Sequence, residues 1–75
     1  MAIKFERRNY YDSFNTGNYA EDNNARFCTE LSEARAREFA DFWKATGCTH
    51  YETSKAHFFE AHTDARHYEQ FILYK

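Results

Sequence analysis

Residues 57 to 67 read HFFEAHTDARH, and the way this stretch folds decides the architecture of the last third of the chain. As a helix, it would begin an amphipathic segment whose apolar residues recur at helical spacing: Phe58, Ala61, Ala65, Tyr68 and Ile72. As strands, it would form a β-hairpin in which KAHFFEA, residues 55 to 61, pairs with HYEQFILYK, residues 67 to 75. Both structures are compatible with the apolar spacing alone.

The hairpin is favoured by the cross-strand pairs that it creates. A three-residue loop at positions 64 to 66 gives three opposed pairs: Phe59 with Phe71, Phe58 with Ile72, and Glu60 with Gln70. Pairs of rings and branched side chains across neighbouring strands stabilise a sheet. The closing FILY, residues 71 to 74, is also more typical of a strand than of a helix end. We therefore predict a hairpin over residues 56 to 74, with a second helix as the alternative.

Upstream of this hairpin, LSEARAREFADFWKATG, residues 31 to 47, predicts an amphipathic helix over about residues 32 to 46. Ser32 is a favourable N-cap residue, and Gly47 can take the left-handed conformation that often follows a helix. Ala36, Phe39 and Trp43 fall on one stripe at 100° per residue, with charged residues on the opposite side. One face of this helix should be buried.

Strand-like segments lie on both sides of the helix. Residues 2 to 11, AIKFERRNYY, alternate apolar and charged side chains at the start, as a half-buried strand does. Residues 25 to 30 and 48 to 54 are shorter strand candidates, and residues 13 to 24 have the polar composition of a turn-rich connection. The expected fold is α+β, one helix packed on a small antiparallel sheet, in a single domain over residues 1 to 75.

Composition and charge exclude several classes of protein. The 75 residues carry a net charge of −2, without the basic excess of a typical nucleic-acid-binding protein. The N-terminal residues include Lys4, Arg7 and Arg8 and no apolar run, so neither a signal peptide nor a membrane span is expected there. Cys28 and Cys48 are expected to be free thiols in a reducing cytoplasm, although their distance cannot be judged from the sequence.

The histidines His57, His62 and His67 recur at every fifth position, but this spacing does not predict a metal site. Five residues advance a helix by 140°, and they alternate the face of a strand, so no regular element gathers the three rings. A hairpin with a four-residue loop would place His62 opposite His67, but also Glu60 opposite Glu69. We expect no metal, no cofactor and no catalytic residues, because phosphate-binding glycine loops and HExxH or CxxC motifs are absent from the sequence.

Aromatic side chains make up 20% of the chain, whereas the branched aliphatic residues are only Ile3, Leu31, Ile72 and Leu73. So small a domain cannot enclose all of these rings, and exposed tyrosine is enriched at protein interfaces. We expect a non-enzymatic protein-binding module, a stoichiometric inhibitor or adaptor of a larger protein. The expected contact residues are Arg7, Arg8, Tyr10, Tyr11, Phe14, Tyr19, Tyr68 and Tyr74.

Two other functions remain open at this point. Bases and rings interleave in the N-terminal strand, which is a feature of single-stranded nucleic-acid binding. Self-association into a homodimer would also cover the surplus rings. In size and character the chain resembles the small accessory proteins that bacteriophages encode to block host factors, including anti-CRISPR inhibitors. That resemblance rests on one compact domain, mixed charge and the lack of an enzyme motif.

Overall fold

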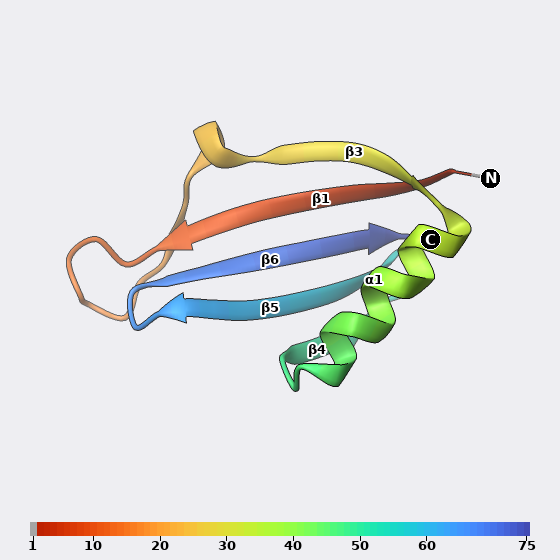
Figure 1. Ribbon diagram of the computed structural model, residues 1–75. Coiled ribbons are helices and arrows are strands. Elements are labelled where there is room, and N and C mark those ends of the chain that lie inside the picture. The colour runs from red at the N-terminus through yellow and green to blue at the C-terminus, as the bar shows by residue number, and fades with distance from the viewer. Residues whose placement is uncertain (1) are drawn as a thin grey trace.

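The computed structural model describes residues 2 to 75, in which six strands form one sheet and one α-helix crosses it (Figure 1). This arrangement confirms the predicted α+β fold. In chain order, the elements are β1 (Ala2–Tyr11), β2 (Ala20–Glu21), the 3-10 helix η1 (Asn23–Ala25), β3 (Phe27–Ser32), α1 (Glu33–Ala45), β4 (Thr49–Glu52), β5 (Ala56–Asp64) and β6 (His67–Tyr74).

All pairs of neighbouring strands are antiparallel, and the sheet is centred on β1 and β6. Beyond β6 lie β5 and then β4, which forms one edge. The other side of β1 is shared by two strands: β3 pairs with its first part, where Phe5 lies opposite Thr29, and β2 pairs with its end. The connection predicted for residues 13 to 24 thus includes the short β2 and the start of η1.

The C-terminal third is the predicted hairpin of β5 and β6, and the alternative second helix is wrong. Its register contains the three expected pairs: Phe59 with Phe71, Phe58 with Ile72, and Glu60 with Gln70. The loop differs in one detail. Asp64 instead of Thr63 pairs with His67, because a register shift between His62 and Asp64 leaves Thr63 as a β-bulge. The turn is thereby shortened to residues 65 and 66.

The helix begins and ends as its sequence predicts. The Ser32 hydroxyl accepts a hydrogen bond from the backbone N–H of Arg35, at 3.2 Å, and thereby caps the first turn. Gly47 has a φ of +76°, the left-handed conformation that glycine adopts without steric cost. The α1 helix therefore connects β3 at one edge of the sheet to β4 at the other, which carries it across one face.

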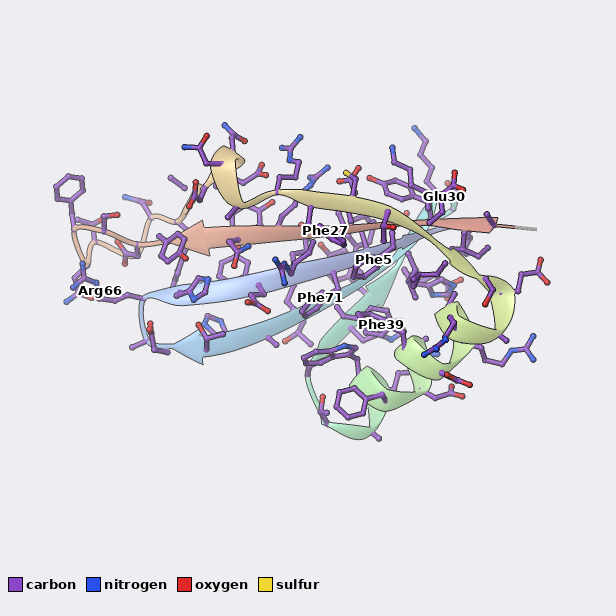
Figure 2. All side chains as sticks on the ribbon, turned by 45° about the horizontal axis from the view of Figure 1, so that its top comes forward. Phe5, Phe27, Glu30, Phe39, Arg66 and Phe71 are labelled. Atoms are coloured by element: carbon purple, nitrogen blue, oxygen red, sulfur yellow. The ribbon has the colours of Figure 1, made fainter. Side chains whose placement is uncertain are left out.

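Aromatic rings build the core between α1 and the sheet. Phe39 of α1 lies at its centre, with its ring centroid 4.9 Å from that of Phe5, 5.4 Å from that of Phe71 and 6.1 Å from that of Phe59. Figure 2 shows Phe39 pointing from the helix toward Phe5 and Phe71. Phe59 is fully buried. Ala36 is also buried in this core and lets the helix approach the strands.

The packing of the core predicts how much two phenylalanine rings contribute to the free energy of unfolding. Replacing buried Phe59 by alanine removes a ring from a closely packed site, and such changes cost about 3–5 kcal/mol of unfolding free energy. Replacing Phe42, a helix residue that is 60% exposed, should cost less than about 1 kcal/mol. Urea denaturation of Phe59→Ala and Phe42→Ala beside the wild type measures both values. Equal losses in the two variants would contradict this core.

Candidate functional site

The face of the sheet opposite α1 is covered by no other element of residues 2 to 75. Side chains alternate between the two faces along a strand. The strand register therefore shows which residues lie on the face away from α1, and this set is called the open face. From β3 to β4 across the sheet, it comprises Cys28, Glu30 and Ser32; Ala2, Lys4, Glu6, Arg8 and Tyr10; Tyr68, Gln70, Ile72 and Tyr74; Ala56, Phe58, Glu60 and His62; and Thr49 and Tyr51. Glu30 is labelled in Figure 2, on the side of the sheet away from the helix.

Tyrosines gather on the open face. Tyr19, from the connection before β2, packs edge-on against Tyr68 with ring centroids 4.9 Å apart. With it, five of the six tyrosines lie on this side of the sheet: Tyr10, Tyr19, Tyr51, Tyr68 and Tyr74. Such a concentration of amphipathic rings on one surface is typical of interfaces rather than of solvated surface.

The rings form two stacks on the face. Tyr10 of β1 and Tyr68 of β6 are opposed in the register and stack at 4.8 Å with an interplanar angle of 12°. Tyr51 of β4 and Phe58 of β5 are likewise opposed and stack at 4.8 Å. Offset ring pairs of this kind contribute about 0.5–1.5 kcal/mol beyond the area that they bury. The stacks therefore add to the stability of the sheet.

Gln70 joins the two stacks through its side-chain amide. The Tyr10 hydroxyl donates to the Gln70 Oε1 atom at 3.2 Å, and the Gln70 Nε2 group donates to the Tyr51 hydroxyl at 3.1 Å. Gln70 is buried, and its two partly buried hydrogen bonds hold the two phenols at a set separation.

Two carboxylates of the open face, Glu6 and Glu60, differ in whether a cation lies beside them. Glu6 is buried and lies between Lys4, at 3.5 Å, and Arg8, at 2.9 Å. Burial alone would raise the pKa of Glu6, but the hydrogen bond and charge of Arg8 outweigh it and the pKa is lowered. Glu60 is half-buried, and no ion pair to it is formed within residues 2 to 75.

The charge of Glu60 acts on the neighbouring phenols. Burial, and then a hydrogen bond to Glu60 and its charge, raise the pKa of Tyr51. Burial and the charge of the same carboxylate raise the pKa of Tyr68. On the far side of the face, burial and Glu6 raise the pKa of Tyr74. Tyr51 and Tyr68 thus belong to one electrostatic cluster with Glu60.

The structure divides the eight contact residues expected from the sequence. Five lie on the open face: Arg8, Tyr10, Tyr19, Tyr68 and Tyr74. Arg7 and Tyr11 lie on the other side of β1, where Arg7 covers the Phe27 ring at 5.7 Å and Tyr11 stacks on His67 at 4.2 Å. Phe14 stands in the loop after β1 and is 87% exposed.

Tyr51, Phe58, Glu60 and Gln70 belong to the face but were not among the expected contact residues. The signal that could have found them is the hairpin register. Once Glu60 is placed opposite Gln70 and Phe58 opposite Ile72, alternation along the strands puts all of these residues on one side. The position of Tyr51 additionally requires the pairing of β4 with β5.

The histidines and cysteines are distributed over different parts of the fold. Within residues 2 to 75, no three His, Cys, Asp or Glu side chains are grouped so that they could hold a metal ion. His50 and His57 stack at 6.0 Å, whereas His62 lies beside Tyr19. Both cysteines are free; Cys28 is exposed on the open face and Cys48 packs against the core on the helix side.

One open depression, between the loop after β1 and the turn of the hairpin, brings Ser13, His67 and Asp64 to its walls. These are residue types of hydrolytic triads, but His67 is already engaged. Its Nε2 group hydrogen-bonds to the Asn9 amide oxygen at 3.0 Å, and its Nδ1 atom to the Thr63 hydroxyl. Both ring nitrogens of His67 are thus hydrogen-bonded to groups other than Ser13.

Comparison of the chain with protein-family models, curated proteins and solved structures finds no match to any of them. No helix among the described residues is long and apolar enough to span a membrane.

The electrostatic cluster predicts that one substitution changes the alkaline titration of two phenols and leaves that of a third unchanged. Folding raises the pKa of Tyr51, Tyr68 and Tyr74. The stability that these phenols contribute is therefore fully present below the pKa of unfolded tyrosine, about 10. It is lost as the pH rises through the higher pKa values of the folded protein. In Glu60→Gln, the pKa of Tyr51 and Tyr68 should fall toward that of free tyrosine, while that of Tyr74 stays unchanged. Ring signals followed by NMR against pH measure each phenol. An equal shift of all three, or of none, would contradict the cluster.

Proposed function

We propose that the protein is a non-enzymatic protein-binding module, which acts as a stoichiometric inhibitor or adaptor by placing its open face on a larger protein. The observation that carries the proposal is the gathering of five tyrosines on the sheet face that α1 leaves uncovered. Tyrosine and arginine are among the residues that most often supply binding energy at interfaces. The small single domain and the free cysteines are in keeping with a cytoplasmic accessory protein of the phage-encoded kind.

The ordering of the open face supports this function. Ring stacking and the Gln70 bridge hold the phenols in place before any partner arrives. A surface whose side chains are already fixed loses less conformational entropy on binding, so more of the contact energy is available as affinity. The mechanism is steric: the face covers a surface of the partner, and charged residues at its rim set the orientation.

Tyr10 and Tyr11 provide a matched test, because they are consecutive residues of the same type on opposite sides of β1. Each stacks on one ring of β6, Tyr10 on Tyr68 and Tyr11 on His67. We expect Tyr10→Ala to weaken binding to the partner at least about tenfold, since truncation of a hot-spot tyrosine costs about 2 kcal/mol or more. Tyr11→Ala should change it less than about twofold. Tagged wild-type protein is used to capture the partner from a host lysate, and titration calorimetry with the purified partner gives the affinities.

Two controls accompany this comparison. Melting temperatures of both variants show whether a loss of binding follows from a loss of folding. Mass-resolved size exclusion of the free protein should give a monomer; a dimer that Tyr10→Ala dissociates would mean that a second copy covers the face. Equal binding losses in Tyr10→Ala and Tyr11→Ala would contradict the open face as the contact surface.

Charge does not favour the alternative function, binding of single-stranded nucleic acid. The open face carries Glu6, Glu30 and Glu60 against two cations, Lys4 and Arg8. Arg8 is already paired with Glu6 at 2.9 Å. Arg7 lies on the other side of β1, over Phe27, so the bases and rings of the N-terminal strand do not form one surface. Phosphates would meet no concentrated positive field on this face.

We therefore expect single-stranded DNA and RNA oligonucleotides not to bind at near-physiological salt. Fluorescence anisotropy with labelled oligonucleotides, repeated at several salt concentrations, checks this. An affinity that falls steeply with salt and falls again in Arg8→Ala would favour the nucleic-acid function over the proposed one.

A further inference from the structure

We propose that the open face receives an arginine side chain of its partner, with the guanidinium paired to Glu60 and lying against the rings of Tyr51 and Tyr68. This inference rests on the proposed function, because it names the chemistry by which the same face recognises a protein. It follows from the position of Glu60 in the sheet, the rings around it and the absence of a counter-charge.

Glu60 lies on β5, one strand in from the edge that β4 forms. It has Gln70 of β6 on one side and Thr49 of β4 on the other. Neither neighbour carries a charge, and the carboxylate is half-buried. A carboxylate in such a position loses part of its hydration, and the hydrogen bond from Tyr51 supplies a neutral donor but no counter-charge. A cation from outside the chain would supply that counter-charge.

The cations of the open face lie too far from Glu60 to neutralise its charge. Arg8 is separated from it by the whole width of β6, in the row Arg8, Gln70, Glu60, and forms its ion pair with Glu6 at 2.9 Å. Lys4 also pairs with Glu6, at 3.5 Å. His62, two residues along β5, packs against the rings of Tyr68 and Tyr19.

The rings next to Glu60 suit a planar cation. Tyr51 is 42% exposed, so its ring is accessible from solvent although it stacks on Phe58. Tyr68 lies on the other side of Gln70 and carries the raised pKa that burial and the Glu60 charge produce. A guanidinium can stack on aromatic rings while its parallel N–H groups pair with a carboxylate in bidentate fashion, whereas an ammonium offers only a point charge. The surroundings of Glu60 therefore favour arginine over lysine.

The experiment measures how an arginine peptide binds to the folded protein. The probe is a fluorescently labelled nona-arginine peptide, with nona-lysine as a ligand of equal charge. The variants are Glu60→Gln, which keeps a hydrogen-bonding side chain beside Tyr51, and Glu38→Gln, which removes the same charge from the exposed surface of α1. Fluorescence anisotropy gives the affinities, and NMR shows which ring signals move.

We expect nona-arginine to bind the wild type more tightly than nona-lysine does and to move the ring signals of Tyr51 and Tyr68. Glu60→Gln should weaken nona-arginine binding at least tenfold, and Glu38→Gln less than twofold. Equal weakening in the two variants would mean diffuse attraction to the net negative charge and would overturn the inference. Absence of binding to the wild type would overturn it as well.

These failures differ from failure of the proposed function. If nona-arginine does not bind but Tyr10→Ala still abolishes capture of the partner, the open face binds protein through chemistry other than a partner arginine. If Tyr10→Ala and Tyr11→Ala are equivalent toward the partner, the contact surface itself has been misplaced.

Discussion

The packing of Phe39 against rings from three strands is the interaction on which the rest of the fold depends. Its ring contacts Phe5 of β1, Phe71 of β6 and Phe59 of β5, so it fastens the helix to the middle of the sheet. The chain has one α-helix in its described residues, and a helix buries one stripe. Within residues 2 to 75 the helix therefore covers one face of the sheet, and the other face is stabilised without a covering layer.

The open face meets this requirement with directional contacts instead of deep burial. Tyr10 and Tyr68 stack, Tyr51 and Phe58 stack, and the buried Gln70 amide links the two stacks. Tyrosine suits this position because its ring supplies apolar area while its hydroxyl remains hydrogen-bonded. The contacts that stabilise the uncovered sheet are thus the same contacts that prepare it for a partner.

Much of this architecture follows from local sequence signals. Ser32 and Gly47 mark the ends of the helix, and the opposed pairs of Phe58 and Phe59 with Ile72 and Phe71 determine the hairpin register. The bulge near the hairpin turn could not be foreseen, because the pairs that fix the register lie farther along the strands. Neither could the pairing of β1 with β6, which joins distant parts of the chain.

The limits of the site prediction have the same origin. Aromatic excess correctly indicates that rings remain outside the core, and alternation along β1 separates Tyr10 from Tyr11. The assignment of each side of β1 to the helix or to solvent requires the path of α1, which no local pattern contains. Tyr51 and Glu60 acquire their importance only when β4, β5 and β6 lie side by side, so their role depends on tertiary structure.

The pairing of β1 with β6 also has a consequence for how the protein is made. Phe5, in the first strand of this sheet along the chain, lies opposite Leu73, in the last strand of this sheet. At roughly 5–20 residues per second, β1 waits on the order of seconds for its partner, and contacts this distant in sequence slow the folding of small domains. Throughout that time the two central strands cannot pair. The sheet can therefore assemble only after β6 has been synthesised, and in this interval the unpaired strands of the nascent chain are exposed to chaperones and proteases.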